Sequence, residues 1–201
     1  MQISFDNTEL ILPDWLTQVE SLPEDPENSV PFAARFEQCM VLCMITEEVH
    51  ANAMDFESPD VVTADIRSLL SETQGIIEVV SGQTAMGNRC IYSIVKNRMK
   101  PTGVEYILSM DIEKAAGSNH VQAYFAETGT TGTRDVMVYD LVRRKGSDPM
   151  EDGTWCYDPY DSTYTEGFLM NQSEERQFDE MFPEHPLSLA RELVRQIGAA
   201  N

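Results

Sequence analysis

The sequence predicts an α+β domain in which an antiparallel β-sheet meander is flanked by helices, that is, an α/β/α sandwich. Apolar segments rich in β-branched and aromatic residues follow one another between residues 76 and 126, separated by short polar turns. In the segment 104–112, one set of alternating positions is apolar and the other is mostly polar, as in a strand with one face in the core. Segments with helical spacing stand on both sides of this run, at 58–70 and 134–145.

The N-terminal part, residues 1–30, reads as a hairpin followed by an acidic loop. The apolar pieces 3–5 and 10–12 flank a polar turn at 6–8, and residues 20–29 are acidic and contain prolines. A buried strand is predicted over 34–46. A helix follows, with Ser58 as N-cap, Pro59 in the first turn and Gly75 at its end. Its apolar stripe is Val62, Ile66, Leu69 and Leu70.

Strands are expected at 76–80, 90–100, 104–112 and 120–126, with a turn at 101–103. The segment 134–145 has apolar residues at helical spacing, and residues 146–172 form a long acidic and aromatic loop. Two C-terminal helices complete the chain. The last begins near Pro186, ends at Gly198 and buries one apolar stripe, formed by Ala190, Leu193, Val194 and Ile197.

Length and composition favour one domain spanning 1–201, with no membrane segment. The chain has 201 residues and is 42% hydrophobic, which is typical of a globular protein. Its longest apolar run, 40–45, is far shorter than the roughly 20 residues needed to cross a bilayer. The first residues lack the basic and apolar regions of a secretory signal. We therefore expect a cytoplasmic protein.

The charge is strongly negative and unevenly distributed. The net charge is −20, and residues 1–60 contain 13 acidic residues and one basic residue, Arg35. Residues 61–150 are balanced at ten of each sign, and residues 151–201 have 11 acidic against three basic. This balance opposes binding to nucleic acid and to anionic membranes. The acidity either provides solubility or attracts a basic partner or cations.

Four cysteines are too few and too scattered for a disulfide scaffold. Cys39 and Cys43 lie in the strand predicted over 34–46, where positions i and i+4 are about 13 Å apart and cannot share a zinc ion. On a helix they could share one. The sequence contains no second cysteine pair and no histidine pair with the spacing of metal ligands, so buried free thiols are the favoured interpretation.

The segments 75–79 (Gly-Ile-Ile-Glu-Val), 92–96 (Tyr-Ser-Ile-Val-Lys) and 103–108 (Gly-Val-Glu-Tyr-Ile-Leu) lie in an order of helix, three-strand meander and helix. This pattern resembles the PsbP-like/DcrB-like α/β/α sandwich superfamily, which includes the Mog-type Ran-binding proteins. The segments 158–167 and 181–187 resemble bacterial proteins of unassigned function from Gram-positive gut species. The resemblance spans about residues 30–145 and has no catalytic motif. It implies a non-enzymatic binding or accessory domain, and no functional residues are carried over.

Aromatic residues concentrate in the long loop and form the first candidate site. Trp155, Tyr157, Tyr160 and Tyr164 could form a surface for a protein partner, since aromatic side chains offer large contact area at low entropy cost. Alternatively, they fold back as a lid over the core.

A second candidate is a glycine-rich turn before the helix at 134–145. Gly129, Gly132, Thr133 and Arg134 could hold an anion through backbone N–H groups and a guanidinium. The segment matches neither a dinucleotide-binding nor a Walker A pattern. The favoured alternative is a tight turn with Thr133 as N-cap.

A third candidate is the basic row of Lys96, Arg98 and Lys100 on one strand. If this row faces Glu105 and Asp111 of the next strand, cross-strand ion pairs absorb the charge. Otherwise, a small basic patch remains as a partner site.

Catalytic chemistry finds little support in the sequence. No Gly-x-Ser-x-Gly motif is present, and His50, His120 and His185 stand in unrelated contexts, although Cys90 and His120 could form a nucleophilic pair. The acidic segment 148–166 could hold a divalent ion for a metal-assisted hydrolase, but its spacing fails the EF-hand pattern. We assign no catalytic residue, cofactor or metal ligand. The sequence favours a binding domain that acts through a protein partner, with the hydrolase or a structural subunit of an oligomer as alternatives.

Overall fold

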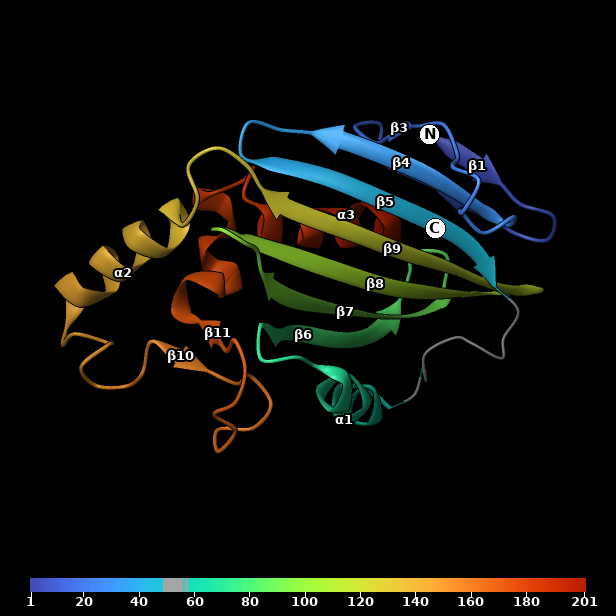
Figure 1. Ribbon diagram of the computed structural model, residues 1–201. Helices are drawn as coiled ribbons and strands as arrows, with labels where there is room; N and C mark the ends of the chain where they lie inside the picture. Colours follow the sequence, from blue (N-terminus) through green and yellow to red (C-terminus); the bar gives the residue numbers. More distant parts are fainter. Residues whose placement is uncertain (49–55, 57) are drawn as a thin grey trace.

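The computed structural model describes residues 1–48, 56 and 58–201 (Figure 1). Within these residues, a seven-stranded antiparallel sheet has the order β3-β4-β5-β9-β8-β7-β6. Its strands are β3 (Thr17–Gln18), β4 (Ser29–Arg35), β5 (Cys39–Glu48), β6 (Gln74–Gln83), β7 (Arg89–Arg98), β8 (Val104–Lys114) and β9 (Gly117–Glu127). The antiparallel meander from β6 to β9 confirms the predicted α+β class.

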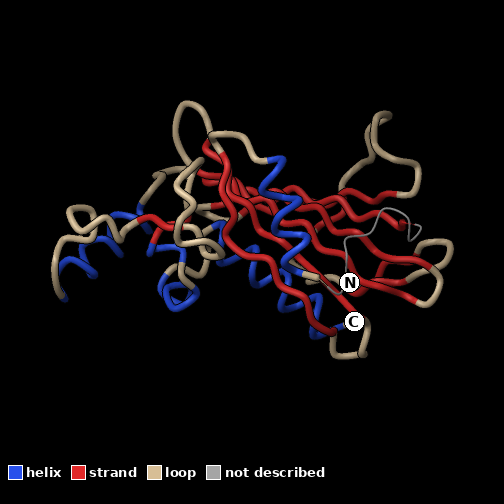
Figure 2. Tube along the Cα trace, turned by 90° about the horizontal axis from the view of Figure 1, so that it is seen from below, coloured by secondary structure: helices blue, strands red, loops and turns tan. Residues whose placement is uncertain are grey.

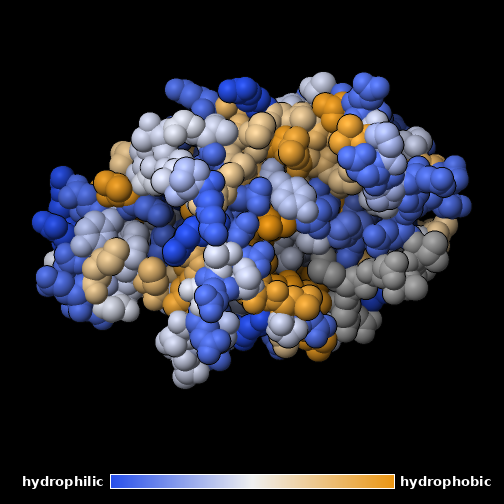
Figure 3. Space-filling view, in the orientation of Figure 1, coloured by the Kyte–Doolittle hydropathy of each residue, from blue (hydrophilic) through white to orange (hydrophobic). Residues whose placement is uncertain are grey.

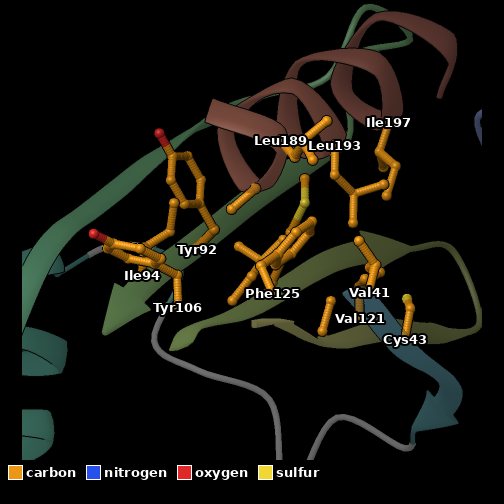
Figure 4. Packing of buried hydrophobic residues seen from close by; sticks show 14 of the residues in the cluster. Val41, Cys43, Tyr92, Ile94, Tyr106, Val121, Phe125, Leu189, Leu193 and Ile197 are labelled. Carbon is orange, nitrogen blue, oxygen red and sulfur yellow. The ribbon is translucent and has the colours of Figure 1, made fainter. Parts of the chain in front are cut away.

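The main core lies between one face of this sheet and helix α3 (Pro186–Ala200). Figure 4 shows Leu193 and Ile197 of α3 above Phe125 and Val121 of β9. The hairpin of β1 (Gln2–Ser4) and β2 (Glu9–Ile11) adds Leu10 to the same cluster. Each fully buried aliphatic side chain contributes about 1.5–3 kcal/mol relative to an exposed one, so this layer is the principal source of stability.

The opposite face carries a smaller cluster at one end. Helix α1 (Pro59–Leu69) packs Val62 and Ile66 against Ile76, Val79 and Ile91 of β6 and β7. Helix α2 (Thr133–Lys145) begins after β9 and extends beyond the end of the sheet (Figure 1). Figure 2 shows the sheet from its β6 edge, with α3 running along the strands. Helices therefore lie on both faces, as predicted, but α1 covers only the β6–β7 end of its face.

Several predicted boundaries are wrong. The segment 34–46 is the end of β4, a turn, and the start of β5; Phe36 donates its N–H to the carbonyl of Cys39 in that turn. Residues 36–38 contain no glycine, proline or asparagine, so the turn leaves no sequence signal. Gly75 lies in β6 rather than ending α1, and the side chain of Leu69 is exposed.

The C-terminal half also differs in detail. The penultimate helix consists of two 3-10 turns, η2 (Gln172–Glu174) and η3 (Arg176–Met181), and α3 continues through Gly198 to Ala200. The loop predicted over 146–172 contains a minimal hairpin of β10 (Cys156–Tyr157) and β11 (Met170–Asn171). His50 lies outside the described residues.

Candidate functional site

The aromatic residues of the long loop are bound to the body of the protein. Trp155 is buried and packs edge-to-face on Tyr139, with ring centroids 5.3 Å apart. Tyr157 donates its hydroxyl to the carboxylate of Glu175 at 3.2 Å. The ring of Tyr164 lies 4.7 Å from the guanidinium of Arg67. These contacts fix the loop in place against the rest of the protein.

Tyr160 has a particular role at the edge strand β6. Its hydroxyl accepts the N–H of Val79 at 2.5 Å and donates to the carbonyl of the same residue at 3.2 Å. Farther along, Phe168 donates its N–H to the carbonyl of Gln74 at 2.9 Å. The loop thereby satisfies backbone groups that an edge strand would otherwise present to other chains.

The acidic residues of the same loop are used in local hydrogen bonds. Asp158 pairs with Arg67 at 2.7 Å, and Asp161 accepts from the hydroxyl of Thr163. Asp148 accepts the hydroxyl of Tyr139, which lowers the pKa of its carboxyl group. Among the described residues, no group of three or more His, Cys, Asp or Glu side chains could hold a metal ion.

The glycine-rich turn already contacts a carboxylate of the chain itself. Glu127 accepts the N–H of Gly132 at 3.1 Å and that of Val104 at 2.9 Å. Gly129 and Gly132 have positive φ angles of 72° and 73°, which lets the chain turn sharply into α2. Gly132, not Thr133, is the N-cap of α2; the Thr133 hydroxyl instead donates to the carbonyl of Thr130.

Arg134 points away from this turn into the protein. Its side chain is 1% exposed and donates to Asp179, to the hydroxyl of Ser188 and to the carbonyl of Ser173. Arg191 of α3 joins the cluster through Asp179 and Glu78. These contacts tie η2, η3 and α3 to the sheet, so the guanidinium that an anion site needs is engaged in the fold.

His185 completes this buried cluster. It is the N-cap of α3, where its Nδ1 accepts the N–H of Leu187, and its ring packs edge-to-face on Tyr106. Burial and the neighbouring guanidinium of Arg134 lower the pKa of His185 to about 3. The imidazole is therefore neutral and structural at ordinary pH.

The basic row does not form a surface patch. Lys96 is 1% exposed, its Nζ lies 2.8 Å from the carboxylate of Glu174, and it sits 4.0 Å from the ring of Phe168. The guanidinium of Arg98 also lies over this ring, 4.5 Å from its centroid, while Lys100 is exposed at the turn. Lys96 and Arg98 face Tyr106 and Val104 of β8, so the cross-strand pairing with the acidic face does not occur.

The described cysteines and histidines, a set that leaves out His50, form no nucleophilic pair. Cys39 and Cys43 are free and buried on the core side of β5, and burial raises the pKa of each to about 12. Cys90 packs at the main core. His120 instead bonds through Nδ1 to Asp111 at 2.8 Å on the other face of the sheet, so it cannot activate that thiol.

A candidate interaction surface lies where the sequence analysis placed none. On the side of β4, β5 and β9 opposite α3, apolar side chains reach solvent. Met40 is 44% exposed, Leu42 52% and Tyr124 39%. Leu42 lies between Ala33 and Tyr124 in the strand register. We call this surface the open face; its residues are Pro31, Ala33, Met40, Leu42, Met44, Gln122 and Tyr124.

A groove of about 250 Å³ opens at the β4 end of the open face. The segment 19–25 forms its other wall, and Figure 3 shows hydrophobic residues gathered over this part of the molecule. We call it the apolar groove; it is lined mainly by Val19, Leu22, Pro31, Leu42, Met44 and Tyr124, with Glu20 and Asp25 at its border. The only sequence signal was the continuous apolar run 40–45, which equally describes a strand buried on both faces.

No protein-family model and no curated protein matches the chain. Among solved structures, the Ran-binding protein Mog1p of Saccharomyces cerevisiae is similar with 11% identity and a TM-score of 0.40, over 62% of this chain and 79% of that one. The Pseudomonas aeruginosa protein of unknown function PA94 has 11% identity and a TM-score of 0.38, over 72% and 91%. A point mutant of Mog1 has 10% identity and a TM-score of 0.40, over 70% and 79%.

Among the described residues, no helix combines the length and apolar character needed to cross a membrane.

Proposed function

We propose that this protein is a non-enzymatic binding or accessory domain that acts through a protein partner, and that the open face is its contact surface. One observation carries the proposal: the apolar residues Met40, Leu42 and Tyr124 stand exposed side by side on adjacent strands. Contiguous exposed apolar surface of this kind marks interaction sites on soluble proteins.

The energetics favour occupation of this surface. Burying one large apolar side chain contributes about 1.5–3 kcal/mol, and a few such side chains at the centre of an interface usually supply most of its affinity. The strands that carry them are fixed by the core on their other side, so little conformational entropy is lost on binding. An extended, rigid apolar surface suits a protein better than a small molecule.

The polar residues support the same proposal. Arg134, Arg191, Lys96 and Glu174 are all buried. Lys96 and Arg191 contact Glu174, and Arg134 and Arg191 share Asp179, so these residues hold the C-terminal segment on the sheet. These groups thus act in the fold and are closed to a substrate. The net charge of −20 also argues against a nucleic-acid ligand. The free cysteines fit a reducing compartment such as the cytoplasm.

The test is affinity capture from the source lysate with three forms of the protein. The wild type is compared with a Leu42→Thr/Tyr124→Thr variant, which removes apolar area while keeping β-propensity and charge. The control is Leu69→Gln on α1, a side chain that is 83% exposed and away from the open face. We expect one stoichiometric partner with the wild type and the control, and its loss with the double variant. Binding of purified partner to the double variant at wild-type strength would refute the proposal, as would capture of no partner.

A further inference from the structure

The apolar groove also indicates what kind of partner segment it takes. We infer that it receives an apolar side chain from a segment of the partner that is flanked by lysine or arginine. This inference rests on the proposed function and specifies the chemistry of the partner at one end of the open face.

The groove is preformed by the segment 19–25. Val19 donates its N–H to the carbonyl of Pro31 at 3.1 Å, which joins the start of the segment to β4. Leu22 and Asp25 close a turn through two hydrogen bonds: the N–H of Leu22 reaches the Asp25 carboxylate at 2.8 Å, and the N–H of Asp25 reaches the Leu22 carbonyl at 3.1 Å. This turn places Leu22, which is 57% exposed, in the lining of the same groove as Leu42.

The floor and walls of the groove are apolar, so they select an apolar side chain. Pro31, Met44 and Tyr124 belong to three adjacent strands, and Leu22 and Leu42 also line the groove. A polar or charged group placed here would lose water without gaining a hydrogen-bond partner. A leucine, methionine or phenylalanine side chain would instead bury its own surface together with that of both leucines.

The border of the groove is acidic. The segment 20–29 contains Glu20, Glu24, Asp25 and Glu27 and no basic residue. Glu20 and Asp25 line the groove itself, whereas Glu27 lines a separate pocket. Glu20 and Glu24 are exposed, and neither takes part in an ion pair within the described residues. Such an uncompensated cluster attracts cationic residues and repels anionic ones within a Debye length, about 8 Å at physiological salt.

The same charge argues against other occupants. A second copy of this chain would bring another net charge of −20 to the contact, and an anionic lipid surface would be repelled in the same way. Arg35 is the basic residue of the first 60, and it stands at the far end of β4, opposite Met40. The combination of an apolar groove and an acidic border therefore favours a basic segment with an apolar anchor.

The experiment uses the full chain and three synthetic 18-residue amphipathic peptides as probes. The first contains leucine and lysine, the second replaces each lysine by glutamate, and the third replaces each leucine by serine. Binding is measured by fluorescence anisotropy, and the contact is mapped by amide shifts in ¹H–¹⁵N NMR spectra. We expect only the Leu/Lys peptide to bind, with shifts confined to residues 19–25, β4, β5 and Tyr124.

Two pairs of variants separate the apolar and the charge contributions. Leu22→Ser/Leu42→Thr should weaken Leu/Lys binding about tenfold or more, since 1.4 kcal/mol of lost apolar contact corresponds to a factor of ten. Glu20→Gln/Glu24→Gln should weaken it several-fold at low salt, and this difference should shrink as salt is raised. Glu151→Gln/Asp152→Asn makes the same change in net charge at an exposed turn elsewhere and should leave binding unchanged.

Each of three results with the peptides and the free protein would overturn the inference. They are equal binding of the Lys/Ser peptide, shifts that map away from the apolar groove, and a concentration-dependent dimer that disappears with Leu42→Thr. The proposed function is tested separately by the captured partner. If the Leu42→Thr/Tyr124→Thr variant loses that partner while Glu20→Gln/Glu24→Gln keeps full affinity, this inference fails and the proposed function stands. If the Leu42→Thr/Tyr124→Thr variant keeps the partner, the proposed function itself fails.

Discussion

Replacement of Lys96 by methionine tests whether the buried ion pair is a main support of the C-terminal segment. Lys96 on β7 and Glu174 on η2 are 78 residues apart in sequence and both are 1% exposed. The carboxylate of Glu174 also accepts the hydroxyl of Tyr106 at 2.7 Å and the N–H of Asn171 at 2.7 Å. Methionine keeps the length and much of the volume of lysine but leaves this carboxylate without its cation.

The expected loss in the free energy of unfolding is about 3–5 kcal/mol, the usual cost of removing one partner from a buried pair. The remaining hydrogen bonds to Glu174 keep the value from being larger. For a chain of this size, such a loss lowers the melting temperature by roughly 6–20 °C, at about 2–4 °C per kcal/mol. Because typical domains are stable by about 5–15 kcal/mol, the variant should still fold at low temperature.

Urea unfolding followed by circular dichroism measures this loss, with Arg98→Met as the matched control. Arg98 contacts the same Phe168 ring at 4.5 Å but is exposed, so its replacement should cost below about 1 kcal/mol. A double-mutant cycle with Glu174→Gln should give a coupling energy of about 1 kcal/mol or more. If Lys96→Met and Arg98→Met destabilise equally, or if the coupling is near zero, the ion pair is not the support that the structure indicates.

Three further predictions concern other contacts of the fold. Gly75→Ala should destabilise by about 1–3 kcal/mol in urea, because a Cβ there would lie 1.9 Å from a backbone carbonyl oxygen of the long loop. Gly82→Ala on the same strand meets nothing within 4 Å and should cost about 0.5 kcal/mol or less; equal losses would contradict this account. Tyr160→Phe should cost about 1 kcal/mol and speed amide exchange at Val79, and unchanged exchange would mean that the hydroxyl does not protect the edge strand. The pKa of His185 is about 3 in the folded protein, against an ordinary value of 6.5. Between these two pH values the unfolded chain binds a proton at His185 and the folded protein does not. The free energy of unfolding should therefore fall as the pH drops from 6.5 towards 3, by about 1.4 kcal/mol per pH unit. The variant His185→Asn keeps an N-cap side chain but cannot titrate. Its free energy of unfolding should therefore depend less steeply on pH between 4.5 and 6.5 than that of the wild type. An unchanged slope would contradict the assigned role of His185.

Local patterns predict most of the elements of this fold. The helices α1 and α3 each carry an apolar stripe, with proline in the first turn, and both form near the expected residues. The strands β7 and β8 are joined by the Pro-Thr-Gly turn, as expected. These features depend on residues a few positions apart. The hairpin of β4 and β5 was missed because its turn, at 36–38, has none of the residues that usually mark turns.

The buried charges could not be predicted in the same way. Lys96, Arg98 and Lys100 alternate in a strand, and alternation shows that Lys96 and Arg98 share a face but not which face. The face is decided by Glu174, which comes from the far end of the chain and makes burial of the lysine tolerable. Arg134 is a similar case: next to two glycines it suggested an anion site, while its partners lie at 173–188. Pairing over such sequence distances leaves no local pattern.

The exposure of the open face is a second feature that sequence patterns do not predict. The run 40–45 is apolar at every position, and such a run is typical of a strand covered on both sides. In this protein, α3 covers one face of β5. Helix α1 packs on β6 and β7, and its apolar cluster includes neither Leu42 nor Tyr124. The odd positions of the run are buried by the chain itself, while Met40 and Leu42 remain exposed. Within the described residues, both faces of β5 are apolar but only one of them is covered, and this is why we propose that a partner covers the second face.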